Sequence, residues 1–339
     1  FQGGIKNLVD SRPPVKKLPP QYVLDLPLNP LCVGIADIPA IDLRRLDGPP
    51  ACRASAVADI GAACADWGFF RIENHEVEWI VIEEMMKVVE GFFDLSVEEK
   101  MKYWSEDVMS PVRYGTSLNT PEKHGGLHWR DYLRHYGHPF HSSFHLWPPN
   151  PPAYRKVVKK YLKVVRTLAM KMLSAISESL GLERDYMEKS MGGEGIQIMA
   201  ANYYPPCPES DKTLGLAGHS DHGALTILID NGVDGLQVNR NDSWMLVPHV
   251  PRSFVVNVGD YIEILSNGKY RSVEHRATVN CERTRISVAA GHGPELCTII
   301  GPAGPLVEMG DGLKFKPITY GEYVRFQQTT PVRGKSALE

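Results

Sequence analysis

Apolar residues recur at the spacing of a helix face in two stretches of the N-terminal half. Between residues 77 and 93, apolar side chains fall every three or four positions, which predicts a helix. A longer stretch of this kind runs from 153 to 180 with Lys and Arg on its other side, and Gly181 marks its end. A further helix is expected from about Ala51. The basic side of 153–180 could serve a membrane or a polyanion, but we favour the solvated face of a core-packed helix.

Short runs of β-branched and aromatic residues predict strands. Two of them, 38–43 and 66–72, flank the helix expected from Ala51. After about Gln197 such runs dominate, with Asn231-Gly232 and Asn267-Gly268 among the turns; they cover 197–204, 224–229, 235–238, 244–247, 253–258, 276–279 and 285–290. The sequence therefore predicts a fold that is mainly β with α: a double-stranded β-helix (jelly roll) core with a helical N-terminal half.

Changes of pattern along the chain divide it into five expected regions that pack as one cooperative unit. Prolines concentrated between 11 and 31 favour an extended arm over residues 1–35. It is followed by an N-terminal region over 36–150, a long supporting helix over 151–195, the jelly-roll core over 196–300 and a C-terminal segment over 301–339. We give the first few residues no structural weight, because Phe1-Gln2-Gly3 is compatible with the remnant of an expression tag.

Composition narrows the class of partner. The chain has 339 residues, of which 43% are hydrophobic and 23% charged, and its formal net charge is −3. This balance gives no general attraction to nucleic acid or to an anionic membrane, so a small-molecule partner is favoured. Six scattered cysteines without a Cys-x-x-Cys pair indicate free thiols in a reducing compartment. No apolar run approaches the roughly 20 residues of a membrane span, and no signal pattern opens the chain. We expect a cytoplasmic monomer.

The candidate chemistry begins with His219-Ser220-Asp221 at the mouth of a predicted strand, where positions i and i+2 point to the same side. Such a triplet alone is weak evidence in a chain with 12 His. His275, before another strand-like run, supplies a second imidazole. Two imidazoles and one carboxylate on one face of a metal are typical of non-haem iron(II) oxygenases, and they leave the opposite face open for a keto acid and dioxygen. The hypothesis is a catalytic metal site formed by His219, Asp221 and His275.

A possible anchor for the keto acid follows ten residues after His275. Arg285 and Ser287 are again an i, i+2 pair, and a guanidinium fork with a neighbouring hydroxyl matches a carboxylate. The Tyr204 phenol, at the end of a predicted strand, could reach the same carboxylate. Taken singly, Arg285 would be interpreted as a surface cation and Tyr204 as a core aromatic; their order along one chain favours the functional interpretation.

These motifs resemble those of the plant-type soluble 2-oxoglutarate- and iron(II)-dependent dioxygenases, the family of anthocyanidin synthase, flavonol synthase and the gibberellin oxidases, to which the ACC oxidases are related. The matches run through nearly the whole chain: Ile38-Pro39-Ala40-Ile41-Asp42, Trp67-Gly68-Phe69-Phe70, Asn74-His75, Asn202-Tyr203-Tyr204-Pro205, His219-Ser220-Asp221, Gly259-Asp260, Ser266-Asn267-Gly268, His275-Arg276 and Arg285-Ile286-Ser287. So many ordered matches make coincidence implausible.

The resemblance implies a set of roles. His219, Asp221 and His275 would be the iron ligands, Arg285 and Ser287 would bind the distal carboxylate of 2-oxoglutarate, and Tyr204 and Asn202 would assist. The cofactors would be Fe(II), 2-oxoglutarate and O2, with ascorbate as reductant. Residues 36–150 would be the family's N-terminal dioxygenase region and 196–300 its iron and 2-oxoglutarate core. The implied reaction is hydroxylation, desaturation or demethylation of a small organic molecule of plant specialised metabolism or hormone turnover.

Two departures from the family pattern bear on this chain. Glu76 stands where the family commonly has Gly, which puts a local turn in doubt. Gly291 stands where the flavonoid enzymes often have a Phe that stacks on the substrate, so a flavonoid held in that way is disfavoured. Candidate substrate residues, each with surface or core packing as an equal alternative, are Tyr114, Thr116, Leu133, Gly291 and His292, the third from the aromatic and basic run 129–136.

Other interpretations remain open. An ascorbate-dependent oxidase like ACC oxidase would need no keto acid, and a small-molecule-binding jelly roll would have no catalytic activity. The latter would leave a carboxylate and imidazoles imperfectly paired. A second metal site could be suspected at four further histidines, but turn residues around them favour a loop: His135, His138, His141 and His145.

Overall fold

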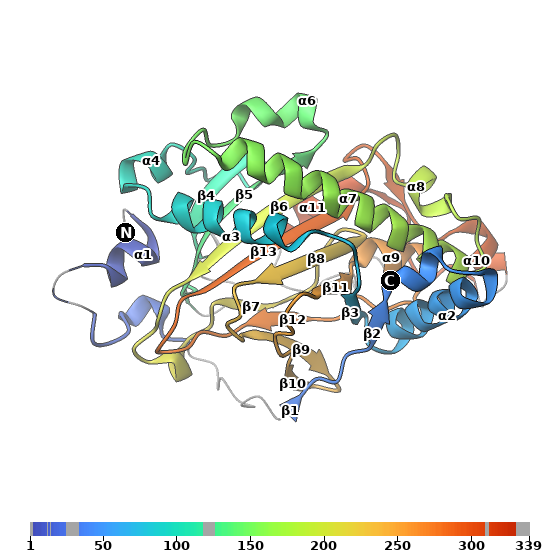
Figure 1. Cartoon of the computed structure of the whole chain (residues 1–339), viewed down its shortest axis with the longest axis horizontal. Coiled ribbons are helices and arrows are strands. Elements are labelled where there is room, and N and C mark those ends of the chain that lie inside the picture. The colour runs from blue at the N-terminus through green and yellow to red at the C-terminus, as the bar shows by residue number, and fades with distance from the viewer. Residues whose placement is uncertain are drawn as a thin grey trace.

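Two β-sheets lie face to face in the computed structural model, which describes residues 3–11, 13, 15–24, 34–117, 126–308 and 312–329. Within that part of the chain, one sheet has eight strands in the order β2-β3-β11-β8-β13-β6-β5-β4 and the other has five in the order β1-β10-β9-β12-β7. The two sheets form a jelly roll (Figure 1), so the predicted fold class is confirmed.

The larger sheet combines strands from both halves of the chain: β2 (Ala40–Asp42), β3 (Phe69–Glu73), β4 (Val112–Thr116), β5 (Asp131–His138), β6 (Ile196–Tyr204), β8 (Leu225–Asp230), β11 (Phe254–Val258) and β13 (Arg285–Gly293). The smaller sheet consists of β1 (Gly34–Ile35), β7 (Leu216–His219), β9 (Leu236–Arg240), β10 (Ser243–Leu246) and β12 (His275–Ala277), and β14 (Ile299–Ile300) pairs with β15 (Ile318–Thr319). The central strands β6 and β13 pair over nine residues each, so they are the longest continuous wall of the roll.

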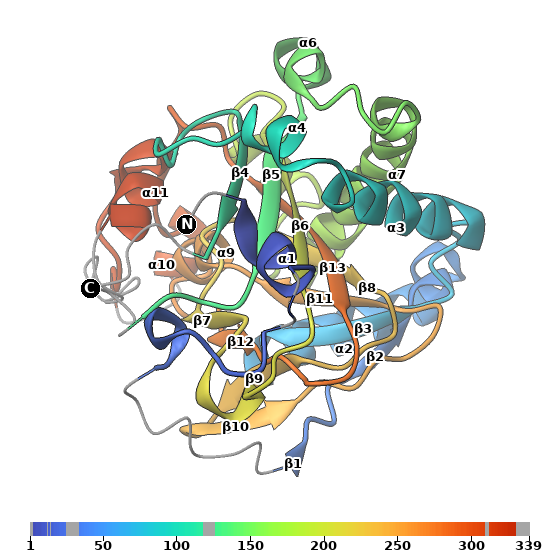
Figure 2. The same cartoon turned by 90° about the vertical axis from the view of Figure 1, so that its left-hand side faces the viewer.

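Helices cover the outer face of the larger sheet. α7 (Tyr154–Ser179) and α3 (Trp79–Phe93) lie side by side on it, and α2 (Pro50–Asp66) packs against α7. Figure 2 shows α3 and α7 on the side of the large sheet away from β7, β9, β10 and β12. The apolar positions of α7, such as Leu162, Val165 and Met172, are fully buried, and Gly181 follows its end with a φ of +77°, which favours glycine. The helical predictions for α2, α3 and α7 are thus confirmed.

Shorter helices complete the described fold: α1 (Gly4–Val9), α4 (Val97–Met101), α6 (Phe140–Ser143), α8 (Tyr186–Ser190), α9 (Asp260–Leu265), α10 (Gly304–Glu308), α11 (Tyr320–Thr329) and the 3-10 turns Pro20–Tyr22, Leu43–Asp47, Phe144–Leu146 and Ser210–Lys212. None of the helices in the described ranges has both the length and the apolar character needed to cross a bilayer.

The expectation that the first few residues, Phe1-Gln2-Gly3, carry no structural weight stays a prediction, but α1 directly after them is attached to the sheet. Ile5 is fully buried, and the backbone N–H groups of Ile5 and Lys6 donate to the buried carboxylate of Asp131 on β5 at 2.7 and 2.9 Å. The predicted extended arm thus contains a short helix attached to the sheet. Residues 25–33 of that arm lie outside the described residues, and the division of the chain into five regions stays a prediction.

The strands predicted after Gln197 are all present with bounds shifted by up to three residues. β4, β5 and β7 were not predicted. β5 has the sequence DYLRHYGH, in which charged and ring side chains replace the apolar alternation that identifies a half-buried strand. Arg134 of β5 is half-buried and His135 is buried, and the hydrophobic pattern alone does not reveal this.

Candidate metal centre and adjoining cavities

Three side chains from distant parts of the chain converge between the two sheets. His219 is the last residue of β7 and lies opposite His275, the first residue of β12, in the antiparallel register of these strands. Nε2 of each imidazole is 3.8 Å from Oδ1 of Asp221, and the candidate ligand atoms all lie within 4.8 Å of one another. Asp221 itself lies in the turn between β7 and β8, so the turn, rather than strand alternation, brings it beside His219.

Hydrogen bonds fix which atoms of these side chains face the shared centre. Nδ1 of His219 lies 2.9 Å from the carbonyl oxygen of Ala217, and Nδ1 of His275 lies 3.3 Å from that of Val273. A carbonyl can only accept, so each Nδ1 carries the proton and donates it, which leaves both Nε2 lone pairs free for a metal.

The carboxylate of Asp221 is oriented in the same way. Its Oδ2 accepts from the hydroxyl of Thr226 at 2.6 Å and from the side-chain amide of Asn257 at 2.8 Å. Oδ1 is therefore the oxygen that faces the two imidazoles. Thr226 and Asn257 were not predicted; neither belongs to a spacing motif, and only their positions on the inner faces of β8 and β11 bring them to Asp221.

The protonation states suit a divalent cation. Burial, followed by the charge of His275, lowers the pKa of His219 to about 4. Burial tends to raise the pKa of Asp221, but the charges of His275 and His219, with the hydrogen bonds from Asn257 and Thr226, lower it overall. At neutral pH His219 is thus neutral and Asp221 ionised, which is the state that metal ligands require.

The donor set fits iron(II). Two imidazole nitrogens and one carboxylate oxygen form the facial set associated with non-haem Fe(II) oxygenases. Among the residues that the structure describes, these three are the group of metal-ligating type that comes close enough together. The four histidines of 135–145 do not form one: His135, for example, is buried and its Nε2 lies 3.0 Å from the Tyr154 hydroxyl.

A first cavity, of about 180 Å³, begins at the three candidate ligands. Its lining includes every residue that the sequence predicts for the keto acid: Asn202, Tyr204, Arg285 and Ser287. In the pairing of β13 with β6, Arg285 lies opposite Tyr204 and Ser287 opposite Asn202. The four side chains alternate with core residues along the two strands, so they share the inner face.

Arg285 is held firmly in this cavity. Its Nε donates to the carbonyl oxygen of Val233 at 3.0 Å, and its guanidinium lies 5.3 Å from the centre of the Tyr204 ring. Gly235 is required beside it, since a Cβ there would lie 2.8 Å from Cδ of Arg285. Asp230 is 4.0 Å from the guanidinium, at the limit of an ion pair. The fork of Arg285 is therefore oriented and only weakly paired.

A polar chain connects the same cavity to β5. Arg130 donates from Nη1 to Oδ1 of Asn202 at 3.1 Å, and Nδ2 of Asn202 donates to Oγ of Ser287 at 3.3 Å. Asn202 thereby orients the Ser287 hydroxyl, whose proton is free to point into the cavity. This gives Asn202 a positioning role that the sequence pattern alone did not specify.

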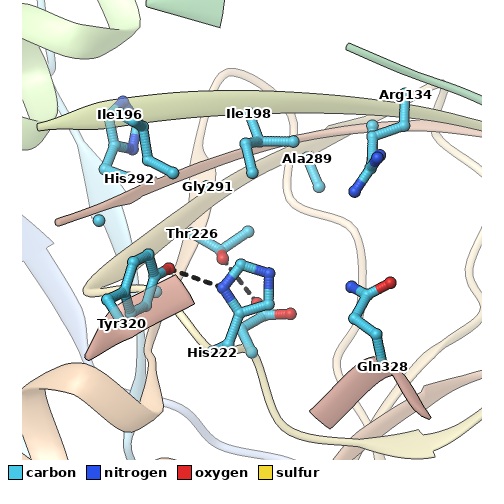
Figure 3. A pocket seen from close by; sticks show the side chains of 14 residues that line it. Arg134, Ile196, Ile198, His222, Thr226, Ala289, Gly291, His292, Tyr320 and Gln328 are labelled. Atoms are coloured by element: carbon cyan, nitrogen blue, oxygen red, sulfur yellow. Dashed lines mark hydrogen bonds between the residues drawn. The ribbon is translucent and has the colours of Figure 1, made fainter. Parts of the chain in front are cut away.

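A second cavity, of about 160 Å³, adjoins the first at Asp221. Figure 3 shows the side chains that line it. The two cavities share Ala200, Asp221, Thr226 and Ala289. The second continues along the same inner faces of β6 and β13 and is closed by the turn after Asp221 and by α11; its remaining lining residues are Arg134, Ile196, Ile198, His222, Gly223, Gly291, His292, Gly293, Tyr320 and Gln328.

The candidate substrate residues divide into two groups. Gly291 and His292 belong to the lining of the second cavity, although the His292 imidazole is buried and its Nε2 lies 2.9 Å from the side-chain nitrogen of Gln197. Tyr114, Thr116 and Leu133 line neither cavity. Leu133 is fully buried in the core, Tyr114 packs near Phe92, and the Thr116 hydroxyl donates to Asp131 at 2.6 Å.

Several lining residues of the second cavity were not predicted. His222 directly follows Asp221, and its Nδ1 lies 2.7 Å from the Tyr320 hydroxyl; burial lowers its pKa. Tyr320 and Gln328 come from α11, about 100 residues further on. Neither spacing nor residue type marks them, because only the docking of α11 beside the ligand turn brings them to the site.

Comparison with known proteins agrees with this geometry. Residues 195–294 match the model of the 2OG-Fe(II) oxygenase superfamily, and residues 38–151 match the family described as non-haem dioxygenase in morphine synthesis N-terminal. The chain is 44% identical to Protein DOWNY MILDEW RESISTANCE 6 of Arabidopsis thaliana, covering 91% of this chain and 90% of that protein. It is 42% identical to Flavanone 3-dioxygenase 2 of Oryza sativa subsp. japonica, with coverage of 91% and 89%.

A solved structure is similar over nearly the whole chain. The crystal structure of JOX2 in complex with 2OG, Fe and JA superposes with a TM-score of 0.88 at 35% identity, covering 98% of this chain and 95% of that one. The crystal structure of a dioxygenase for auxin oxidation in rice gives a TM-score of 0.75 at 27% identity, with coverage of 89% and 98%.

Proposed function

Because the chain belongs to the 2OG-Fe(II) oxygenase superfamily, we propose that His219, Asp221 and His275 hold its iron(II). We further propose that Arg285 and Ser287 hold the distal carboxylate of 2-oxoglutarate, with Tyr204 and Asn202 in support. The enzyme is a 2-oxoglutarate-dependent dioxygenase, an oxidoreductase that acts on a small organic molecule. The observation that carries the assignment is the orientation of three ligand atoms, Nε2, Nε2 and Oδ1, toward one point.

In this proposal, the protein's own residues bind and orient the metal, the keto acid and the organic substrate. When bound, iron(II) supplies the redox chemistry by which dioxygen converts 2-oxoglutarate to succinate and carbon dioxide while the substrate is oxidised. Thr226 and Asn257 keep one carboxylate oxygen of Asp221 turned to the metal, and the Arg285 fork with the Ser287 hydroxyl offers donors to the far carboxylate of the keto acid. The second cavity, which meets the first at Asp221, holds the organic substrate beside the metal.

The substrate belongs, in this proposal, to plant specialised metabolism or hormone turnover, and its oxidation is a hydroxylation, desaturation or demethylation. The printed names of related proteins include a flavanone dioxygenase, a flavonol synthase and a dioxygenase for auxin oxidation. Because Gly291 has no side chain, the substrate in this proposal is held without an aromatic contact at that position. Ascorbate would serve as a reductant that keeps the iron ferrous.

We also propose that the protein works as a cytoplasmic monomer without nucleic-acid partners. The support is compositional: the formal net charge is −3, and the scattered cysteines include Cys52, Cys64 and Cys207, which form no disulfide in the described part of the chain. Sedimentation equilibrium at micromolar concentration tests the monomer.

Succinate release is the direct test of the reaction. Purified protein is incubated with Fe(II), 2-oxoglutarate and fractions of a plant metabolite extract, and succinate and product mass are read together. We expect succinate that depends on Fe(II), on 2-oxoglutarate and on an active fraction. Turnover that persists without 2-oxoglutarate and requires ascorbate would instead indicate the ACC-oxidase-like alternative.

A further inference from the structure

Arg134 is a cation in the wall of the second cavity. It lies on β5 opposite Ala200 of β6, which in turn lies opposite Ala289 of β13. These two alanines are too short to fill the space above the sheet, so the row leaves room beside the arginine. Figure 3 shows the guanidinium directed into this space, on the side where Gln328 of α11 faces it.

No carboxylate of the described residues forms an ion pair with Arg134, and Asp107 attracts its charge only from a longer distance. Its Nη2 donates to the carbonyl oxygens of Val108 and Ser110, each at 2.8 Å. The ion pairs of arginine in the described ranges are formed by other residues: Arg44, Arg45, Arg53, Arg71, Arg184, Arg240 and Arg285. Burial is the main cause that lowers the pKa of Arg134, and the charge of Arg113 acts in the same direction. A half-buried guanidinium of this kind favours an anion that approaches its open edge.

The cavity offers no competing acid. Among its described lining residues the single carboxylate is Asp221, whose Oδ2 accepts two hydrogen bonds and whose Oδ1 faces the two imidazoles. An anionic group placed at Arg134 would therefore meet a cation, and Asp221 is the single lining carboxylate that could repel it.

The sheet wall of this cavity is apolar. Ile196, Ile198, Ala289 and Gly291 form the sheet side. The cavity volume of about 160 Å³ is close to the roughly 150 Å³ of a protein cavity that holds one benzene molecule. The space thus suits a single ring or a short branched chain, and three fused or linked rings would exceed it.

We propose that the second cavity binds a compact organic acid, with its carboxylate on Arg134, its ring-sized apolar body against Ile198 and Gly291, and the bond to be oxidised toward the shared wall at Asp221. This inference rests on the proposed function, and it makes Arg134 the residue that selects acids over neutral molecules. Ala200 and Ala289 provide the space, and α11 closes it.

The test compares acids with their neutral isosteres. The holoenzyme with Fe(II) and saturating 2-oxoglutarate is titrated without oxygen by calorimetry, with benzoate against benzamide and with cyclohexanecarboxylate against its amide. We expect each acid to bind roughly tenfold to a hundredfold more tightly, as charge-assisted hydrogen bonds imply. Arg134→Gln should abolish this preference while binding of Fe(II) and 2-oxoglutarate is retained.

A neighbouring arginine provides the matched control. Arg113 on β4 lies opposite Arg134, is buried, and donates from Nε to the carbonyl oxygen of Ser105, but it lines neither cavity. Arg113→Gln removes the same charge nearby and should leave the preference for acids intact. If it weakened acid binding as much as Arg134→Gln, a general positive potential would explain the result and the specific site would be refuted.

Other outcomes are decisive without any variant. Equal binding of acid and amide to the wild-type holoenzyme would overturn the proposal even if Arg134→Gln failed to fold. So would acid binding that weakens as 2-oxoglutarate is raised, because the acid would then occupy the cavity of Arg285. In both cases bound Fe(II) and 2-oxoglutarate would leave the proposed function standing, whereas failure to bind either of them would refute that function itself.

Discussion

The two cavities are built on the same pair of strands but differ in how their arginines are held. In the first, Arg285 lies over the Tyr204 ring and donates to Val233, with Asp230 4.0 Å away. In the second, Arg134 donates from one nitrogen to two carbonyl oxygens and has no ion pair within the described ranges. The first cavity thus has a guanidinium fixed in one orientation, whereas the second presents one whose charge is left for a ligand.

They differ also in the origin of their walls. Eleven lining residues of the first cavity come from β6, β7, β12 and β13, strands whose pairing register fixes their positions. The second adds the turn after Asp221 and α11, which join the sheet through side-chain contacts such as that between His222 and Tyr320. In the proposed assignment, a cosubstrate common to many enzymes would occupy the part fixed by strand register, and the part that selects the substrate would be assembled from elements that can vary independently.

The largest effect should follow loss of a proposed metal ligand, either Asp221, which lines both cavities, or His219, which lines the first. We expect Asp221→Ala or His219→Ala to lower turnover by more than about a hundredfold, since even residues that merely support metal ligands account for tenfold to a hundredfold. Succinate formation measures the effect, and metal content after dialysis measures its cause. The control is His145→Ala, an exposed histidine that lines neither cavity. Undiminished turnover in either ligand variant would refute the assignment of the metal centre.

A conservative change at Arg285 should affect only the first cavity. Arg285→Lys keeps the charge but loses the planar fork, so the 2-oxoglutarate concentration for half-maximal rate should rise about tenfold or more. The affinity for the organic ligand in the second cavity should stay constant. A variant that needed more organic substrate and unchanged 2-oxoglutarate would reverse the roles of the two arginines.

Filling the second cavity should have the complementary effect. A Cβ at Gly291 would lie 3.7 Å from the Thr226 hydroxyl and 3.8 Å from the carbonyl oxygen of Ile198, which are ordinary contacts. Gly291→Leu would therefore fit the backbone and occupy the space beside Ile198. We expect roughly tenfold weaker binding of benzoate with an unchanged requirement for 2-oxoglutarate. Gly291→Ala should give a smaller loss in the same direction; tighter binding in both variants would show that the cavity is not limited by size.

The same contrast explains what the sequence could predict. His219 with Asp221 and Arg285 with Ser287 are pairs at i, i+2 spacing that the sequence displays, and strand register brings His275 opposite His219 and places Arg285 and Ser287 on β13, whereas a turn brings in Asp221. The family resemblance covers these residues as well. That these residues line one cavity could therefore be predicted from the sequence.

The second cavity could not be predicted in this way. Arg134 lies in a strand that lacks the alternation of apolar and polar residues. Ala200 and Ala289 matter only because their small side chains leave space beside the arginine, and no sequence pattern marks this role. Tyr320 and Gln328 reach the site because α11 docks there. Tyr323 and Gln327 donate to the buried carboxylate of Asp260, which also accepts from Ser220, the residue between His219 and Asp221. Tyr114 and Leu133 are predicted as substrate residues from their place in the chain, but both are buried in the core.

His292, which belongs to the lining of the second cavity, allows a smaller test of how firmly the wall of that cavity is packed. Its imidazole contacts the side-chain nitrogen of Gln197 at 2.9 Å and the carbonyl oxygen of Leu225 at 3.4 Å. Burial, followed by the charge of Arg166 on α7, lowers the pKa of His292 to about 3, and His138 on β5 acts in the same direction. The folded protein therefore keeps this group neutral throughout the weakly acidic range.

In the unfolded chain the same histidine takes up a proton below about pH 6.5. The free energy of unfolding should thus fall as the pH drops from about 6.5 toward 3, because the unfolded state binds the additional proton. Between pH 7.5 and 5.5 the contribution of this one group is about 1 kcal/mol. His292→Gln, which keeps a donor and an acceptor, should remove that part of the pH dependence in urea unfolding. An unchanged pH dependence in the variant would mean that His292 is already solvated in the folded state, and the wall that separates the second cavity from α7 would then be looser than the packing of β13 implies.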